Sequence, residues 1–261
     1  MGTRDATMKL AVAAVDRARA ALPNAFGILP KSEVKVEPFP AFAEANAPGG
    51  QYNQPADDGS RPGIYYINLR NPQQLPRAGI ESTAFHEAYP GHHLQIAIAM
   101  ERKGLHPVQR YFFMSGFTEG WGLYSERLAE EMGLFSSDVD RMGLLSNEAL
   151  RAARLVVDPG MHALGWSRDR AIQYMLDNTA ESRESVVAEI DRYIAVPGQA
   201  TAYMLGNLEI RRLREEAKQQ LGEKFDQRAF HDHVLEDGGV PLVMLRQKIE
   251  RWIAAGGGAG K

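Results

Sequence analysis

Helical patterning runs from about Arg77 almost to the C-terminus and limits this chain to a mainly α fold. Glycine and proline interrupt the pattern at intervals, and each interruption predicts the end of a helix. These breaks fall near residues 90–91, 104–107, 133, 158–160, 197–198, 222 and 238–241. We therefore expect about seven or eight helices in a single domain that spans residues 1–261.

The chain ahead of Arg77 is less regular. An amphipathic pattern predicts an N-terminal helix within residues 1–22, and Pro23 ends it. In the Pro-, Gly- and Asn-rich segment that follows, "EVKVEPF" alternates apolar and charged residues, which predicts a short strand. "IYYINL", at residues 64–69, is a second strand candidate. We expect these strands to form a small β-ribbon ahead of the helix that carries His86.

Composition excludes several classes of protein. Hydrophobic residues make up 44% of the 261 residues and charged residues 24%, so the chain is able to bury a core. The formal net charge of −3 gives no reason to expect a nucleic acid or an anionic membrane as partner. The chain has no cysteine, which excludes disulfides, thiol catalysis and thiolate metal sites. Any bound metal ion must therefore use His, Asp or Glu.

The two ends of the chain carry little functional information. Arg17 and Arg19 interrupt the N-terminal apolar residues, so the segment lacks the pattern of a signal peptide. No window of about 18 apolar residues predicts a membrane-spanning helix. Cysteine-free proteins occur in every compartment, so the localisation stays open. The glycine-rich residues 254–261 are expected to form a flexible tail.

One short stretch, "HEAYPGHH", contains the residues best suited to bind a metal. His86 and Glu87 begin like the H-E-x-x-H helix of zinc peptidases, but Pro90 occupies the position of the second histidine. On an unbroken helix His92 would point about 240° away from His86, and His93 would lie about 10 Å along the axis. Zinc–nitrogen distances are about 2.0–2.1 Å, so neither histidine can share a metal with His86 on a straight helix.

The helix is not expected to be straight at this point. Pro90 removes a backbone donor and clashes with the preceding turn, while Gly91 tolerates backbone angles that other residues avoid. A kink or bulge there would bring a later histidine back toward His86. We interpret the coincidence of His-Glu, Pro-Gly and His-His as a metal site with a built-in break, in which His92 and His93 are both candidate ligands.

A third ligand is predicted in "FTEGWGLYSERLAEEMG". The large apolar residues recur at spacings of three and four, which is typical of a helix with one buried face. Glu119 lies off that face among Gly116, Gly120 and Gly122, and a plain exposed helix would not carry three glycines. Close approach of another backbone explains them better, so Glu119 is the predicted third ligand. Glu126 follows at helical spacing and is expected either to orient a ligand or to lie at the surface.

Other motifs are weaker. "FHDHV" contains a rival pair, His231 and His233, but side chains two residues apart on a helix diverge. We interpret both as surface or end-of-helix residues. The chain has no Walker loop, no G-x-G-x-x-G after a strand and no G-x-S-x-G elbow.

Four stretches together resemble the bacterial family called domain of unknown function 885. They are "HEAYPGHHLQ", "FTEGWGLYSERLAEEMG", "RAARLVVDPGMHALGWSRDRAIQY" and "EIDRYIAVPGQATAYMLG". The resemblance runs from about Val34 to Trp252. Members are usually roughly double this length, which implies that the chain corresponds to their C-terminal half and lacks a preceding helical portion. Many members carry export signals.

That family in turn looks like a zincin with a glutamate ligand, similar to carboxypeptidase Taq and angiotensin-converting enzyme. The resemblance implies a zincin-like helical domain in which Zn²⁺ is held by His86, His92 and Glu119. It matches Gly91-His92 to the Gly-His pair of those enzymes, which favours His92 over His93. "YMLG" resembles, more weakly, a segment of carboxypeptidase Taq whose tyrosine assists the reaction. In zincins an edge strand ahead of the helix also binds extended peptides, and "GIYYINL" is the candidate here.

The implied chemistry is metal-assisted hydrolysis. Glu87 is the expected general base, which takes a proton from water and passes it to the leaving amine. A donor must stabilise the oxyanion, and the candidates are Tyr203, His162 and Arg192. Each has an ordinary structural explanation as well: a core tyrosine, a cap on a local turn and a surface ion pair. Asp158 is expected to orient a ligand or His162.

The predicted function is that of a zinc-dependent metallopeptidase acting on a peptide or small amide substrate. Two alternatives stay open. The first is a metal hydrolase of a non-peptide amide or ester. The second is an inactive binding or scaffold module whose cleft is closed by a portion absent from this chain. The His/His/Glu donor set also admits Mn, Co or Fe.

Overall fold

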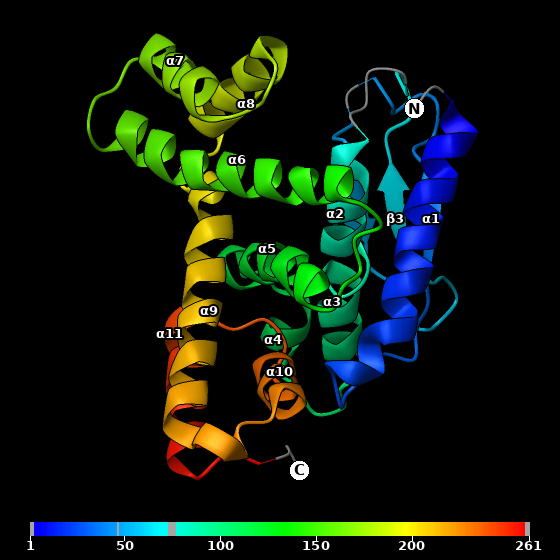
Figure 1. Ribbon diagram of the computed structural model, residues 1–261, viewed down its shortest axis with the longest axis vertical. Helices are drawn as coiled ribbons and strands as arrows, with labels where there is room; N and C mark the ends of the chain where they lie inside the picture. The colour runs from blue at the N-terminus through cyan, green and yellow to red at the C-terminus, as the bar shows by residue number, and fades with distance from the viewer. Residues whose placement is uncertain (1–2, 46, 73–76, 259–261) are drawn as a thin grey trace.

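The computed structural model describes residues 3–45, 47–72 and 77–258, and Figure 1 shows the arrangement of its elements. The strands are β1 (Val34–Pro38), β2 (Gly50–Asn53) and β3 (Gly63–Ile67). The α-helices of these residues are α1 (Arg4–Ala21), α2 (Ala78–Glu87), α3 (His92–Glu101), α4 (Pro107–Tyr111), α5 (Ser115–Glu131), α6 (Asp138–His162), α7 (Arg168–Asn178), α8 (Arg183–Ala195), α9 (Ala202–Leu221), α10 (Gln227–Leu235) and α11 (Leu242–Ala254). Short 3-10 turns occupy Leu22–Asn24, Gln199–Thr201 and Gly222–Lys224. The predicted mainly α fold with a small β element ahead of α2 is confirmed.

The three strands form one small sheet with β3 in the centre. β1 pairs with β3 in parallel, and β2 pairs with β3 in antiparallel fashion, so the strand order is β1-β3-β2. β1 and β3 correspond to the two predicted strands, whereas β2 has no apolar alternation that would signal it. The expectation that "GIYYINL" is an edge strand is wrong, because β3 is covered on both sides. The edge strand that packs on α2 is β2.

Buried apolar side chains form two separate clusters. The main core draws on α1, β3, α2, α3, α5, α9, α10 and α11, and Trp121, Tyr124 and Phe85 are fully buried within it. A second core joins α6, α7 and α8, with Val157, Met175 and Ile190 among its members. In Figure 1, α7 and α8 lie above one end of α6, away from α1 and the sheet. α9 leads from this region back into the main core.

The glycines of α5 allow direct contact with the backbone of α9. A Cβ atom added to Gly120 would lie 2.4 Å from Gly206 Cα. One added to Gly206 would lie 1.9 Å from the carbonyl oxygen of Gly116. Neither distance leaves room for a side chain, so the close backbone approach predicted for this stretch is confirmed. The contact places Glu119, next to Gly120, close to the first turn of α9, which carries Tyr203.

The predicted helix breaks mostly coincide with helix ends, with one exception. α6 continues through Pro159 to His162, where a break was expected. Pro159 lies in the last turn, and only three residues of the helix follow it. The backbone amide of Ala163 still donates to the Pro159 carbonyl at 2.9 Å. Two further breaks, at residues 112–114 and 179–182, are not marked by glycine or proline, so the expected number of helices is too low.

The first and last helices lie near the two ends of the described chain. α1 begins after Thr3, whose hydroxyl accepts a hydrogen bond from the Ala6 amide at 3.1 Å. α11 ends at Ala254, where the predicted tail begins. Residues 1–2 of the predicted N-terminal helix and residues 259–261 of the tail lie outside the described residues. Within the part of the chain that the structure describes, no helix combines the length and apolarity needed to cross a membrane.

Candidate metal centre

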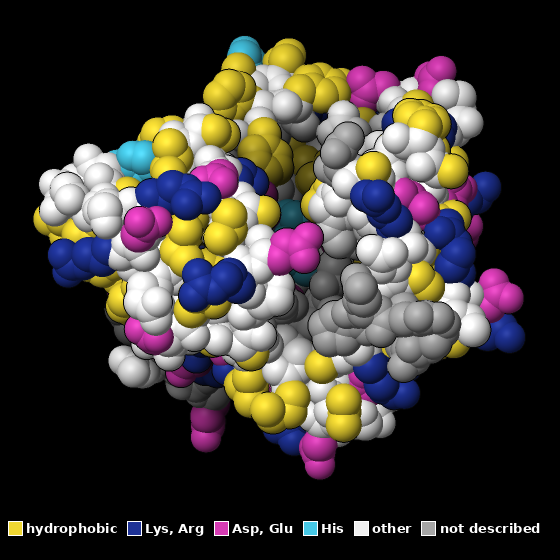
Figure 2. Space-filling model, turned by 90° about the horizontal axis from the view of Figure 1, so that it is seen from above, with side chains coloured by type: hydrophobic (Ala, Val, Ile, Leu, Met, Phe, Trp, Pro, Cys, Tyr) yellow, Lys and Arg dark blue, Asp and Glu magenta, His cyan; other side chains and the backbone are white. Residues whose placement is uncertain are grey.

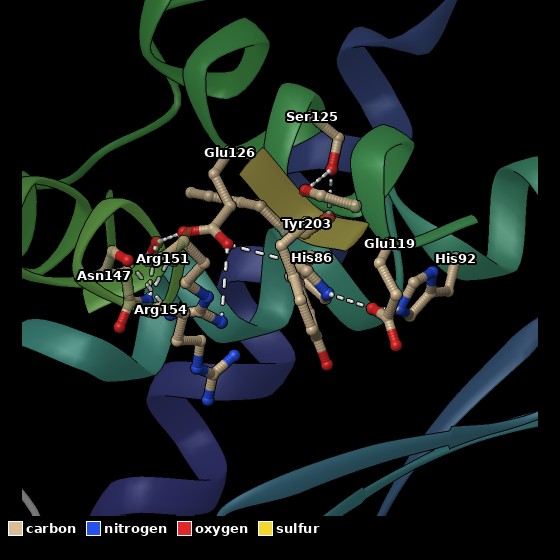
Figure 3. Close-up of polar contacts among 12 residues, drawn as sticks. His86, His92, Glu119, Ser125, Glu126, Asn147, Arg151, Arg154 and Tyr203 are labelled. Atoms are coloured by element: carbon tan, nitrogen blue, oxygen red, sulfur yellow. Dashed lines mark hydrogen bonds and ion pairs between the residues drawn. The ribbon is translucent and has the colours of Figure 1, made fainter. Parts of the chain in front are cut away.

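Three potential metal ligands from three helices converge at one point (Figure 3). His86 comes from the last turn of α2, His92 from the first turn of α3 and Glu119 from α5. Glu119 Oε2 lies 3.6 Å from His86 Nε2 and 3.4 Å from His92 Nε2. All three residues are buried, and one donor atom from each lies within 4.8 Å of the others. The structure thus brings together the predicted ligand set.

The distances from Glu119 to the two histidines fit a tetrahedral metal ion. Zinc bonds of about 2.0–2.1 Å in tetrahedral geometry place neighbouring ligand atoms about 3.3–3.4 Å apart. The separations of 3.4 and 3.6 Å are close to this value and longer than an ordinary N–H···O hydrogen bond of about 2.7–3.2 Å. The donors therefore converge on a common point rather than bonding to one another. Binding of a metal by these residues stays a prediction.

The break between α2 and α3 creates this convergence, as predicted. α2 ends at Glu87 and α3 begins at His92. A Cβ atom on Gly91 would lie 1.9 Å from the carbonyl oxygen of His86, so only glycine fits. The indole of Trp121 donates a hydrogen bond to the Pro90 carbonyl at 3.0 Å and holds the turn from the α5 side.

His93, the alternative second ligand, points away from this site. Its Nδ1 lies 2.9 Å from the hydroxyl of Tyr52 in β2, and its Nε2 lies 3.0 Å from the carbonyl oxygen of Ser32. Burial lowers the pKa of His93 to about 4, so its ring is neutral near pH 7. His93 therefore ties α3 to the sheet, and His92 is the histidine that faces His86.

Glu126 orients His86. Its Oε1 lies 2.8 Å from His86 Nδ1, and its Oε2 accepts hydrogen bonds from the hydroxyl of Ser82 and from Asn147 Nδ2, the latter at 3.3 Å. The Glu126 side chain is fully buried, so the surface alternative is wrong. A carboxylate on Nδ1 makes that nitrogen the donor and leaves Nε2 free to bind a metal.

The charges around His86 favour a cation. Burial opposes protonation of His86, but the carboxylates of Glu119 and Glu126 outweigh it and raise the pKa of His86 to about 9. Burial also opposes ionisation of Glu119, yet the two histidines hold its pKa far below the usual range. A buried imidazole that retains a proton this strongly marks a point of negative potential. A metal ion would supply the positive charge there in place of the proton.

The third glycine of the α5 stretch makes room for the ligand itself. A Cβ atom on Gly122 would lie 2.6 Å from both Nε2 and Cε1 of His86. The His86 ring therefore rests directly on the backbone of α5. Gly122 is thus needed for the ligand position, whereas Gly120 is needed for the contact with α9.

A cavity of about 640 Å³ opens onto the three donors. Figure 2 looks down into the hollow, with histidine atoms visible at depth. The cavity lies within the range of about 300–1,000 Å³ common for small-molecule sites. Glu87 lines it beside His86, is half-buried and makes no hydrogen bond to any residue that the structure describes. Residues 50–52 of β2 also line the cavity.

Two of the three predicted oxyanion donors line this cavity. The Tyr203 ring stacks on His86 with centroids 6.1 Å apart, and its hydroxyl lies 3.5 Å from Gln199 Nε2. Arg192 donates to Gln199 Oε1 at 2.7 Å and to Glu189 Oε2 at 3.0 Å. The predicted ion pair of Arg192 is therefore present, although it lies at the cavity wall rather than on the outer surface.

His162 and Asp158 lie elsewhere, and their expected roles are not supported. His162 is exposed outside the cavity, and its Nε2 lies 3.1 Å from the carbonyl oxygen of Tyr193. Asp158 accepts a hydrogen bond from the Gly198 amide at 3.0 Å and contacts neither His162 nor a ligand. The reason is the continuity of α6, which carries His162 to the exposed end of the helix.

The interpretation of His231 as a surface residue is wrong. It is fully buried, with Nδ1 2.9 Å from the carbonyl oxygen of Ala25 and Nε2 2.7 Å from the hydroxyl of Tyr124. Burial lowers its pKa to about 3. His233 bonds instead to Glu236 at 2.6 Å, so the two histidines diverge as expected and form no metal pair.

Sequence reasoning missed the polar face of α6. Asn147, Arg151 and Arg154 line the cavity, and Asn147 supports Glu126. Their spacings of four and three residues place them on one side of the helix, which is the signal that would have found them. The main core and the second core leave this face of α6 turned toward His86.

Comparison with known proteins finds a matching family model and similar solved structures. A family model described as "Bacterial protein of unknown function (DUF885)" matches residues 1–249. The crystal structure of a "putative lipoprotein" from Colwellia psychrerythraea is 43% identical, with a TM-score of 0.93 over 97% of this chain and 43% of that one. A "putative lipoprotein of unknown function" from Shewanella oneidensis is 25% identical, with a TM-score of 0.67 over 90% of this chain and 45% of that one. No curated protein matches. The chain thus spans less than half the length of either solved relative.

Proposed function

The chain belongs to the bacterial DUF885 family, and from its candidate metal centre we propose that it is a zinc-dependent hydrolase of peptide bonds. The observation that carries the proposal is the convergence of buried donor atoms from His86, His92 and Glu119 at an open cavity, with Glu87 beside them. Three protein ligands with a fourth position open to the cavity distinguish a catalytic zinc site from a structural one.

In the proposed hydrolysis, three residues would hold the metal and a fourth would transfer protons. Bound at His86, His92 and Glu119, zinc would lower the pKa of water and polarise the substrate carbonyl. Glu87 has no competing partner among the described residues, so its carboxylate is available to take the proton from the attacking water. The same carboxylate then delivers the proton to the leaving nitrogen.

Tyr203 is the best placed donor for the developing oxyanion. Its ring stacks on His86, and burial, the main cause, raises the pKa of its hydroxyl. The hydroxyl therefore keeps its proton and is able to donate a hydrogen bond in the transition state. Arg192 is already engaged by Glu189 and Gln199, which makes it a weaker candidate.

The edge strand β2 supports an extended substrate. It lies at the open side of the sheet, packs on α2, and its residues 50–52 line the cavity beside the donors. A peptide that pairs with this edge would run past His86 in extended form. β2 thus takes the substrate-binding role that the sequence suggested for β3.

The two solved relatives indicate where such an activity would take place in the cell. Both are described as lipoproteins, which supports an exported member of the family. Because they are more than twice as long as the matched region, a further portion would complete the walls of the cleft in a full-length protein.

Metal analysis and a single substitution test the proposal. We expect about one zinc per chain, and chelation should lower the melting temperature because a ligand that binds only the folded state stabilises it. Glu87→Gln should abolish hydrolysis of a peptide library while it retains the metal. Glu223→Gln, an exposed residue of the turn after α9, is the matched control and should leave hydrolysis unchanged.

The outcomes separate the alternatives. Hydrolysis that survives Glu87→Gln would contradict the assigned base. Cleavage of esters or small amides without cleavage of any peptide would favour the non-peptide hydrolase. A metal-free protein whose melting temperature is unchanged by chelation would favour the binding or scaffold module.

A further inference from the structure

Three arginines line the cavity on the side of α6 and α8. Arg151 and Arg154 come from α6 and Arg192 from α8, and we call them the arginine wall. Figure 3 shows Arg151 and Arg154 on one side of Tyr203, with Glu119 and His92 on the other. The cavity therefore has an acidic end at the metal centre and a basic end at the arginine wall.

Arg154 is buried and has an unused donor. Its residue exposure is 7%, its Nε donates to the hydroxyl of Tyr193 at 2.7 Å, and its Nη2 donates to Glu189 Oε2 at 2.6 Å. Its Nη1 donates to no residue that the structure describes and is therefore free to donate to a ligand in the cavity. In Figure 3 the guanidinium of Arg154 and the hydroxyl of Tyr203 extend in the same direction.

Arg151 is also incompletely paired. Its Nη1 donates to the carbonyl oxygen of Asn147 at 3.3 Å, and its Nε is buried with no partner within the described ranges. Its ion-pair contact is with Glu126 at 3.9 Å, and that carboxylate already bonds to His86 and Ser82. A guanidinium in this position is able to accept a further anionic partner.

The charge balance of the arginine wall fits a monoanion. Glu189 Oε2 accepts from both Arg154 and Arg192, so one carboxylate serves two arginines. Glu181, which also lines the cavity, accepts from the hydroxyl of Ser185 and contacts none of the three. The excess of positive charge is therefore small, which suits a carboxylate better than a phosphate dianion. The planar guanidinium also matches the two oxygens of a carboxylate.

The arginine wall lies one aromatic ring away from the metal centre. Tyr203 stacks on His86 with centroids 6.1 Å apart, and the guanidinium carbon of Arg154 lies 4.9 Å from the centroid of the same ring. That of Arg151 lies 5.7 Å from it. An extended peptide advances about 3.3–3.6 Å per residue. A group held at the wall would therefore lie within about three residues of the bond at the metal centre.

From these contacts we propose that Arg151 and Arg154 bind a carboxylate of the substrate and that its source is the C-terminus of a peptide. The inference rests on the proposed function, because it assigns a substrate class to the same cavity. It makes the protein a carboxypeptidase that releases at most about three C-terminal residues. An acidic side chain offers the same chemistry and is distinguished by the test.

The test measures affinity rather than turnover. Isothermal titration calorimetry on the Glu87→Gln protein would compare an N-acetylated tetrapeptide with a free C-terminus and the same peptide as its C-terminal amide. We expect the free acid to bind at least about 10-fold more tightly, because it alone offers charged hydrogen bonds to the wall. In that background Arg151→Gln or Arg154→Gln should weaken binding of the acid about 10- to 100-fold and change binding of the amide by less than about threefold.

Matched variants separate recognition from folding. Arg154→Lys keeps the charge but loses the planar fork, so it should restore only part of the affinity. Arg183→Gln, on the exposed start of α8 and away from the cavity, should leave both affinities unchanged. Arg151 makes one backbone hydrogen bond, so Arg151→Gln retains the second core even where Arg154→Gln does not fold.

Each possible result of the titrations supports or overturns the proposed carboxylate site. Equal affinity for the acid and the amide, absence of binding by both, or an equal loss for both in the arginine variants would overturn the proposal. An amide peptide with Asp as its last residue that binds as tightly as the free acid would support the carboxylate site and assign the side chain as its source. Failure of the proposed function is seen separately, as the absence of metal or of any peptide hydrolysis in the unsubstituted protein.

Discussion

The metal centre and the arginine wall face one cavity but are held in different ways. The metal centre is set by backbone contacts, since Gly91 abuts the His86 carbonyl and Gly122 lies beneath the His86 ring. Two members of the arginine wall, Arg154 and Arg192, are held by ion pairs to Glu189 at the edge of the second core, and the third, Arg151, contacts Glu126 at 3.9 Å. Backbone contacts tolerate little displacement, whereas ion pairs adjust. The position of the metal ligands is therefore fixed by the backbone, while the arginine wall is able to adjust to a ligand.

The largest effect is expected from one carbon atom added beneath the His86 ring. Gly122→Ala should displace the imidazole and abolish zinc binding, because the new Cβ would lie 2.6 Å from Nε2. Metal content after purification measures the effect. Gly79→Ala in α2 is the control, since an added Cβ there meets no atom within 4 Å. Gly122→Ala protein with a full complement of zinc would contradict the backbone control of the site.

A smaller effect is expected from the carboxylate that orients His86. Glu126→Gln should weaken zinc binding about 10- to 100-fold, the usual result when such a partner of a ligand histidine is replaced. Competition with a chelating dye measures the affinity. Glu130→Gln, in the surface ion pairs of the same helix, provides the comparison and should leave it unchanged. Equal affinities in the two variants would exclude an orienting role for Glu126.

Acid should reduce the stability of the main core through His231. The pKa of His231 is about 3 in the folded protein against 6.5 for an ordinary histidine. Between these values the unfolded chain binds a proton that the folded chain excludes, so the free energy of unfolding falls as the pH falls. The slope from this group is up to about 1.4 kcal/mol per pH unit.

Urea denaturation at several pH values between 7 and 4 tests this expectation. His231→Gln should reduce the slope, because the buried imidazole no longer titrates on unfolding. His162→Gln, at the exposed end of α6, should leave it unchanged. If both variants keep the original slope, another group is responsible for the loss of stability in acid.

The smallest effect concerns the link between the second core and α9. Asp158→Ala should reduce the free energy of unfolding by about 1–3 kcal/mol, because the amide of Gly198 loses its buried acceptor. Zinc content should not change, since the metal centre belongs to the main core. Parallel denaturation and metal analysis of one preparation measure both quantities. A loss of zinc would show that the two regions are not independent.

Short-range rules predicted most of the helices but not the elements that depend on tertiary contacts. Glycine and proline mark the ends of α2, α5, α8 and α9, because their effects on the backbone are local. The sequence of β2 carries no strand pattern, and its pairing with β3 makes it a strand. The proline of α6 lies too near the helix end to break it, and so His162 was expected in the wrong place.

The candidate site also contains residues that local patterns predict and residues that only tertiary contacts determine. His86, Glu87 and Glu119 could be named from local patterns, while the choice between His92 and His93 rested on a resemblance. Deciding that choice requires the contact between Gly91 and the His86 carbonyl, which no spacing rule contains. The arginines of α6 could not be assigned to the cavity, because their position depends on how the second core sets α6 above His86.

The contact between Gly120 and Gly206 limits how this protein is able to evolve. A larger residue in a packed interface is commonly accommodated by a smaller one opposite. At this crossing both partners already lack a side chain, and each added Cβ would fall within 2.6 Å of the other helix's backbone. No compensating substitution exists at the point of contact, so a change at either position could be rescued only by moving a whole helix. The two glycines are thus expected to remain together, or to be lost together with the site beside them.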